Sequence, residues 1–256
     1  MKRCSLFIVA ALFAASLTAQ DADSVIKASR DRISADTIST RSLMVITAKD
    51  GSTTERLLDQ YANDIDDTKS TMIVFQKPTS VAGTRFLTIE KKGGSDDRWI
   101  FLPALGKVRR VASSEGSARF VGTDFSYDDI SSVNRAASAD THTMLKEESI
   151  RGTPCHVIES IPKDSGFQYS KLISWIAKDS LVSERIELYD RKGNHVKTVE
   201  ILETKEVQGR LSPMVTKMST LADGTSTEIR VQILKYDDPI PAGVFTTNFL
   251  STGRVR

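Results

Sequence analysis

The sequence is poor in the residues that hold small exported domains together or bind metals. Its 256 residues include two cysteines, three histidines and 7% aromatic side chains. Cys4 precedes the first apolar run, so a processed chain would keep only Cys155, and one cysteine cannot form an internal disulfide. His142, His156 and His195 are scattered and match no H-E-x-x-H or similar zinc pattern. We therefore expect a fold stabilised by its apolar core, with no metal site.

Motifs of common enzyme classes are also missing. The chain has no G-x-S-x-G elbow, no G-x-G-x-x-G fingerprint and no P-loop. Ser24 and Lys27 match S-x-x-K, but no K-T-G partner follows, so we interpret the match as chance. We expect no catalytic residue and no cofactor, and hence a protein that is not an enzyme.

The N-terminus has the pattern of a secretory signal peptide. Lys2 and Arg3 precede a nearly unbroken apolar run over residues 5–17, and small residues follow it. The run is short for a membrane span, which needs about 20 apolar residues, although an uncleaved anchor helix is the alternative. We expect residues 1–19 to be a cleaved signal peptide, residues 20–256 to form one domain, and the protein to be periplasmic.

Charge argues against general binding to nucleic acid. The whole chain carries 35 Lys and Arg residues against 33 Asp and Glu residues. Cleavage would remove Lys2 and Arg3 and leave a formally neutral chain. Proteins that bind nucleic acid nonspecifically need a net or clustered positive field, so no such partner is expected.

After a helical pattern over residues 21–36, the chain consists of short extended runs separated by turn residues. Asp50-Gly51, Gly93-Gly94, Lys192-Gly193-Asn194 and Asp223-Gly224 are turn signals of antiparallel hairpins. The spacing predicts 11 or 12 strands. They are expected at 42–49, 54–62, 70–77, 83–91, 97–102, 107–112, 152–160, 167–177, 181–190, 195–206, 211–221 and 226–236.

Two regions depart from simple alternation. The runs at 72–75 and 99–102 are apolar on both faces, so each is either covered on both sides or lines an apolar cavity. Residues 113–145 alternate little, which predicts a looped excursion over the sheet with a short helix near Tyr127 to Val133.

Charged residues cluster in and before this excursion. Lys107, Arg109, Arg110 and Arg119 form a basic patch, and Asp124, Asp128 and Asp129 follow it. The patch has three possible partners, namely an acidic protein, an anionic lipid headgroup, or carboxylates of the same chain. Asp128 and Asp129 lie at an expected helix start, where carboxylates are favoured by free N–H groups, so a structural role is preferred over acid/base chemistry.

The stretch from Trp99 to Asp129 carries a family resemblance. W-x-F-x-P at Trp99–Pro103 is followed by K-x-R-R at Lys107–Arg110 and by F-x-G-T-D-F-S-Y-x-D at Phe120–Asp129. Together these motifs resemble the outer-membrane lipoprotein-sorting protein family, a branch of the LolA/LolB-like superfamily. Pro78 with Gly83-Thr84, and a later region that includes Trp175, fit the same pattern, so the resemblance extends over most of the chain beyond the signal.

The resemblance implies a mainly β fold with a few helices. The expected form is an incomplete, strongly curved antiparallel barrel of about 11 strands, with helices covering a concave apolar face. It also implies a periplasmic carrier that binds the acyl chains of lipoproteins or other lipids and moves them towards the outer membrane. Because members of this branch accompany RND-type export permeases, a non-enzymatic adaptor subunit of such a permease is the alternative function.

Candidate site residues follow from this picture. Arg109, Arg110, Asp124 and Asp128 are expected to brace the motif loop. The side chains chosen for an acyl-binding cavity are large and apolar, and each could equally be core. They are Phe75, Leu87, Trp99, Phe101, Phe120, Phe125 and Trp175.

Overall fold

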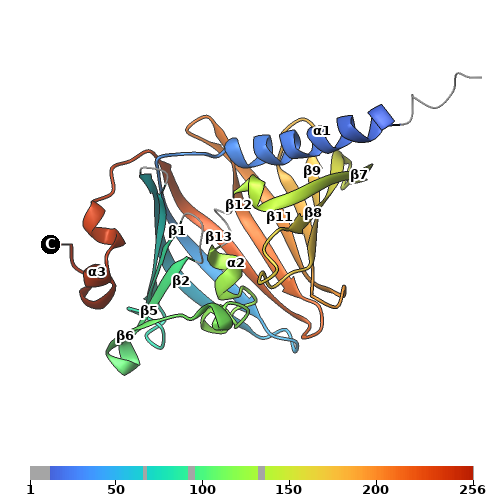
Figure 1. Cartoon of the computed structure of the whole chain (residues 1–256). Helices are drawn as coiled ribbons and strands as arrows, with labels where there is room; N and C mark the ends of the chain where they lie inside the picture. The colour runs from blue at the N-terminus through green and yellow to red at the C-terminus, as the bar shows by residue number, and fades with distance from the viewer. Residues whose placement is uncertain (1–11, 66–67, 92–95, 132–135, 256) are drawn as a thin grey trace, which may run out of the picture.

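The computed structural model is one strongly curved sheet with three helices (Figure 1). It describes residues 12–65, 68–91, 96–131 and 136–255. The helices are α1 (Leu12–Asp31), α2 (Tyr127–Ser131) and α3 (Thr247–Thr252). The strands are β1 (Thr37–Thr47), β2 (Thr53–Ile65), β3 (Thr68–Lys77), β4 (Arg85–Ile89), β5 (Asp97–Leu102), β6 (Lys107–Arg110), β7 (Asp140–Ile150), β8 (Thr153–Pro162), β9 (Lys171–Ala177), β10 (Ser183–Tyr189), β11 (His195–Val207), β12 (Arg210–Thr220) and β13 (Thr225–Tyr236).

The sheet is built from two meanders joined at its centre. Its strand order is β6-β5-β4-β3-β2-β1-β13-β12-β11-β10-β9-β8-β7, and every neighbouring pair is antiparallel. The first strand therefore pairs with the last, with Ile38 opposite Tyr236. β6 and β7 follow each other in the chain but lie at opposite edges, so the curved sheet does not close into a barrel.

Turn chemistry places the hairpins where the sequence predicts them. Gly51, Gly193 and Gly224 connect β1 to β2, β10 to β11 and β12 to β13, and each has a positive φ. A positive φ costs glycine little because it has no Cβ. The predicted turn at Gly93-Gly94 lies outside the described residues.

The predicted class is confirmed, but the strand count was too low. The described ranges contain 13 strands, and the one that sequence reasoning missed is β7, which begins inside the predicted excursion. Its buried residues at alternate positions are Asp140 and His142. Because polar side chains fill the buried positions, a search for alternating apolar residues does not detect this strand.

The helices cover different faces of the sheet (Figure 1). α1 packs Ala22 and Ile26 against Ile158 of β8 and Ile176 of β9. It ends at Asp31, five residues before the predicted end, and the first 11 residues of the expected signal peptide lie outside the described residues. α2 lies inside the concave side. None of the helices within the described ranges is long and apolar enough to cross a bilayer.

α3 covers the convex face, an arrangement that the sequence did not predict. Val244 and Phe245, which precede it, and Leu250 within it pack against Met72 and Leu87 of β3 and β4. These contacts explain why β3 and β5 are apolar on both sides. Met72 and Trp99 face α3, whereas their neighbours in sequence face the concave side.

Arg85 fastens α3 to the sheet. Its Nε donates to the carbonyl of Leu250 (2.7 Å), Nη2 donates to that of Ser251 (3.1 Å), and the guanidinium lies 4.6 Å from the ring centroid of Phe101. The last carbonyls of a helix lack intrahelical partners, so a cation there satisfies them.

Replacing Arg85 with alanine is expected to lower the free energy of unfolding by about 1–3 kcal/mol, because it removes charged hydrogen bonds and a ring contact. Urea unfolding measures the loss, and hydrogen exchange is expected to accelerate over residues 247–252. Arg230→Ala is the control, since Arg230 makes an exposed pair with Glu228 that contributes little. Equal effects of the two variants would contradict the fastening role.

Candidate functional site

The connection between β6 and β7 crosses the concave opening, beside the part of that face on which α1 packs. Because β6 and β7 lie at opposite edges of the sheet, the connection between them must bridge the opening. We call its described first part, residues 111–131, the cover segment; it contains α2 and the third of the family motifs, Phe120–Asp129 (Figure 1). The fold therefore places the motif over the concave face.

One half of the concave face is filled by two aromatic rings of the cover segment. Phe120 and Tyr127 pack on the apolar side chains of β1 to β5, with ring centroids of Phe120 and Phe86 5.1 Å apart and those of Phe120 and Phe75 5.8 Å apart. Phe75, Phe86 and Phe120 are fully buried. Offset and edge-on aromatic contacts of this kind add to the burial of apolar surface.

The other half is filled by Phe125. It packs with Tyr169, Leu188 and Met218, which are carried by the segment before β9 and by β10 and β12. Thus Phe120 and Tyr127 reach one half of the concave face while Phe125 reaches the other. The cover segment spans the apolar interior of the sheet and fills it with its own side chains.

Asp124 anchors the cover segment to the β12–β13 hairpin. Its carboxylate accepts hydrogen bonds from the hydroxyls of Thr220 (2.6 Å), Thr225 (2.5 Å) and Thr227 (2.7 Å), and its side chain is fully buried. A buried carboxylate is tolerated only when donors surround it. The three hydroxyls meet that requirement.

A second anchor combines a helix cap with an ion pair. Ser126 and Asp129 form a capping box at the start of α2, because each side chain accepts a hydrogen bond from the other's backbone N–H (2.8 and 3.0 Å). Asp129 also accepts from Nζ of Lys197 (2.7 Å) and the hydroxyl of Tyr169 (2.8 Å). Burial, and secondarily Asp129, raises the pKa of Tyr169 above its usual range.

The remaining loop residues make ion pairs within the chain. Asp128 binds Nη1 of Arg98 (2.5 Å), Arg109 binds Glu115 (2.8 Å), Arg110 binds Asp97, and Arg119 binds Asp223. The described partners of the basic patch are thus carboxylates of the same chain. Apart from a long contact between Arg119 and Asp124 (3.9 Å), they are not the motif aspartates.

The structure divides the seven side chains chosen for an acyl cavity between two faces. Phe75, Phe120 and Phe125 lie on the concave side, the first two in contact with each other and Phe125 in the other half. The other four pack on the convex side, three under the C-terminal segment and one beside Cys155; they are Leu87, Trp99, Phe101 and Trp175. One cavity cannot contain both groups, so only the first three lie where an acyl chain could replace them.

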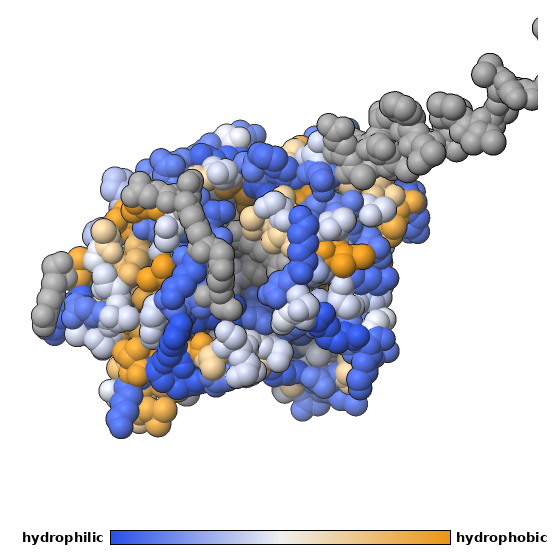
Figure 2. Space-filling view, in the orientation of Figure 1, coloured by the Kyte–Doolittle hydropathy of each residue, from blue (hydrophilic) through white to orange (hydrophobic). Residues whose placement is uncertain are grey.

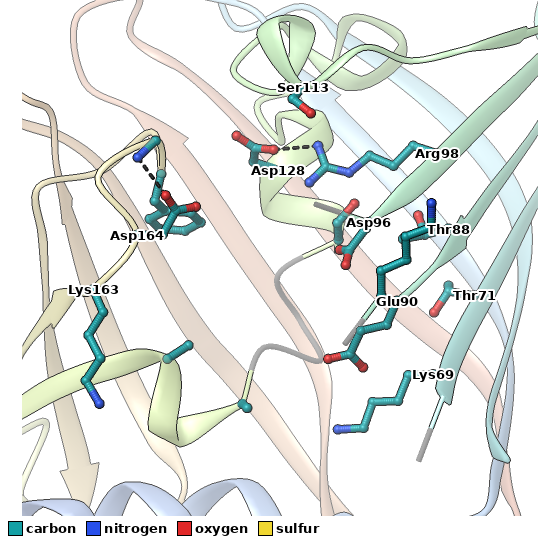
Figure 3. Close-up of a pocket in the computed structure, with 16 residues that line it drawn as sticks. Lys69, Thr71, Thr88, Glu90, Asp96, Arg98, Ser113, Asp128, Lys163 and Asp164 are labelled. Carbon is teal, nitrogen blue, oxygen red and sulfur yellow. Dashed lines mark hydrogen bonds and ion pairs between the residues drawn. The ribbon is translucent and has the colours of Figure 1, made fainter. Parts of the chain in front are cut away.

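A pocket of about 520 Å³ opens beside the cover segment on the same concave side. Most of its lining residues are polar or charged, whereas the resemblance implies an apolar space. Figure 3 shows Lys163 and Asp164 on one wall and side chains of β3 to β5, among them Arg98, on the other. The lining residues are Lys69, Thr71, Thr88, Glu90, Lys91, Asp96, Arg98, Ser113, Asp128, Ser131, Ala136, Ala139, Lys163, Asp164, Gly166 and Phe167.

The surface around the opening is largely hydrophilic. Figure 2 shows hydrophobic groups in several places, among them the lower left, where β5 and β6 lie in Figure 1. Leu105, which lies between these two strands in the chain, is strongly exposed. Within the described ranges, no group of three or more His, Cys, Asp or Glu side chains is arranged to hold a metal ion. Cys155 is buried on the convex side, and burial raises the pKa of its thiol.

Comparison with models of known protein families shows the family to which the chain belongs. A family model described as "-like: Uncharacterized protein" matches residues 67–252. The chain belongs to this family. The match includes the whole cover segment. Among curated protein sequences, none matches the chain.

Three solved structures share the fold. A putative outer membrane lipoprotein-sorting protein domain from Vibrio parahaemolyticus is 27% identical with a TM-score of 0.85. A DUF1329 family protein from Desulfovibrio piger ATCC 29098 is 24% identical (TM-score 0.87), and a LolA superfamily protein from Nitrosomonas europaea is 22% identical (TM-score 0.71). Each comparison covers 91% of this chain and 99% of the other. The resemblance predicted from the motif, and the LolA-like fold, are confirmed.

Proposed function

We propose that the protein is a periplasmic carrier that binds the acyl chains of lipoproteins, or other lipids, on its concave face and moves them towards the outer membrane. The observation that carries this proposal is the way the concave face is covered. Between β1 to β5 on one side and β9 to β12 on the other, the apolar interior is filled by a connecting segment and not by a second sheet, while α1 packs farther along the same face on β8 and β9. That segment can leave without breaking a pair of neighbouring strands in the sheet.

Carrying lipid through water requires such an interior. Burying each CH₂ group is worth about 0.8 kcal/mol, so a chain with several acyl groups does not travel free. Phe120, Phe125 and Tyr127 occupy the space that acyl chains would take. In the proposed cycle, acyl chains replace these rings on the sheet when the cover segment moves outward.

The other elements of the proposal concern processing and chemistry. We propose that residues 1–19 are a cleaved signal peptide, that residues 20–256 form a single carrier domain, and that the protein is not an enzyme and has no nucleic-acid partner. The likeness to the lipoprotein-sorting domain from Vibrio parahaemolyticus supports a role in the cell envelope. Arg109, Asp124 and Asp128 are proposed to hold the cover segment in its closed position, and Arg110, which pairs with Asp97, is proposed to brace the neighbouring β5–β6 hairpin of the motif.

Mass spectrometry of lipids extracted from the protein, purified after export, tests the proposal directly. We expect retained lipid or lipopeptide, and displacement of a fluorescent fatty acid by added lipopeptide. A protein that holds no lipid and binds neither the lipopeptide nor the fatty acid contradicts a carrier. That result would favour the adaptor subunit of an RND-type permease, for which the exposed hydrophobic groups near β5 and β6 would be the contact surface.

A further inference from the structure

The concave side of β3, β4 and β5 changes from apolar to polar between two adjacent rows of side chains. The strand register defines these rows, because residues opposite each other on neighbouring strands lie side by side. The apolar row is Ile73, Phe86 and Ile100, and the polar row is Thr71, Thr88 and Arg98. Phe120 and Tyr127 cover the apolar row, whereas the polar row lines the pocket.

Two groups in the polar row have unused hydrogen-bonding capacity within the described residues. Thr88 is 7% exposed, and its hydroxyl has no hydrogen-bond partner among the residues that the structure describes. Nε of Arg98 is buried and equally without a partner there, although Nη1 binds Asp128. Buried polar groups are nearly always satisfied in folded proteins, so unsatisfied ones lining a pocket mark a place for an acceptor.

The next row outward carries charges of both signs. Lys69 and Glu90 are backbone neighbours across β3 and β4, and Asp96 precedes β5 on the same side (Figure 3). Burial raises the pKa of Asp96, so a cation beside this carboxyl would be favourable. Lys163 lies on the opposite wall, where its Nζ donates to the carbonyl of Ser138 (2.8 Å).

We propose that this pocket binds a zwitterionic phospholipid headgroup, with the phosphodiester at Thr88 and Arg98 and the primary ammonium at Glu90 and Asp96. The inference deepens the proposed function and rests on it. The order of the rows matches the order of groups in such a lipid. Acyl chains would lie on the apolar row, the phosphate on the polar row, and the ammonium on the outer, charged row.

The mixed charge of the wall favours a zwitterion over a simple anion. Four cationic and four anionic side chains line the pocket, so their formal charges cancel and a ligand without net charge fits the wall better than a simple anion does. The cations are Lys69, Lys91, Arg98 and Lys163, and the carboxylates are Glu90, Asp96, Asp128 and Asp164. A phosphate with an ammonium two carbons away presents both signs at once.

Calorimetric titration with short-chain lipids tests the headgroup inference. The probes are dihexanoyl phosphatidylethanolamine, dihexanoyl phosphatidylglycerol, which lacks the ammonium, and glycerophosphoethanolamine, which lacks acyl chains. We expect the ethanolamine lipid to bind about tenfold more tightly than the glycerol lipid, which corresponds to one charged hydrogen-bond contact. The free headgroup is expected to compete with it for the pocket at higher concentration.

Variants separate the two parts of the headgroup. Asp96→Asn and Glu90→Gln are expected to reduce the preference for ethanolamine to about twofold or less. Thr88→Val is expected to weaken the binding of both lipids. It is also expected to raise Tm by about 2–4 °C, because it removes an unsatisfied buried hydroxyl. Glu147→Gln is the matched control, because Glu147 lies on β7 in an exposed pair with Lys178. This substitution should change neither the preference for the ethanolamine lipid nor Tm.

The outcomes distinguish this inference from the proposed function. Equal affinity for the two lipids, with acyl binding intact, overturns the headgroup pocket and leaves the carrier standing. No binding of either lipid, with no binding of a fluorescent fatty acid, overturns both. A Thr88→Val protein that is more stable yet binds the ethanolamine lipid with unchanged affinity also overturns the pocket.

Discussion

Replacing Phe120 with alanine is expected to lower the free energy of unfolding by about 3–5 kcal/mol and, at the same time, to tighten acyl binding. The ring is fully buried and touches Phe75, Phe86 and Tyr127, so its loss leaves a large cavity in the apolar half of the concave face. The same loss weakens the docking of the cover segment. If lipid binds only when that segment has moved away, a larger open fraction raises apparent affinity, by about tenfold for each 1.4 kcal/mol.

Urea unfolding and displacement of a fluorescent fatty acid measure the two effects on one sample. Phe245→Ala is the matched control, because Phe245 is buried to a similar degree but packs on the convex face. It is expected to destabilise the protein without changing acyl affinity. If Phe120→Ala bound fatty acid no better than Phe245→Ala, the cover segment would not be in competition with lipid.

Replacing Asp129 with alanine is expected to cost about 3–5 kcal/mol of folding free energy. The substitution leaves the ammonium of Lys197, whose side chain is 15% exposed, without its carboxylate partner. It also removes the acceptor of the Tyr169 hydroxyl and half of the capping box of α2. The loss should appear in urea unfolding and as faster hydrogen exchange over residues 127–131.

A double variant separates the ion pair from the cap. Asp129→Ala with Lys197→Met removes the isolated charge, so much of the lost stability should return, because uncharged residues often replace buried pairs at little cost. The part that does not return measures the cap and the contact with Tyr169. Additive effects of the two substitutions would show that Lys197 and Asp129 do not stabilise each other.

Sequence reasoning found the sheet because its apolar runs and turn residues are local signals. Eleven or 12 strands were expected and 13 are present. The helix predicted to begin at Tyr127 is present, and its predicted end, Val133, lies outside the described residues. The carboxylate of Asp129 caps the start of the helix together with Ser126, in agreement with the structural role expected for a carboxylate there. β7 escaped detection because Asp140 and His142, not apolar residues, fill its buried positions.

The site was harder to predict because local pattern does not tell the concave face from the convex one. Alternation puts Ile100 and Trp99 on opposite faces, yet it cannot say that Trp99 will meet a C-terminal helix. The seven cavity residues, chosen for their size and apolarity, therefore included side chains from both faces of the sheet. The sequence of β4 alone shows that one face carries polar Thr88 next to apolar Phe86. That Thr88 forms a polar row with Arg98 depends on the register between β4 and β5, which the sequence does not give.

The pairing of β1 with β13 has a consequence for how the chain folds. Each meander can form from neighbours in sequence, but the contact that unites them joins Ile38 to Tyr236. Until β13 is available, β1 is an unpaired edge, and edges of this kind template aggregation. Contacts between such distant residues also make folding slow. Completion of the sheet therefore has to wait until residues 225–236 are available, so the two meanders join only at a late step of folding.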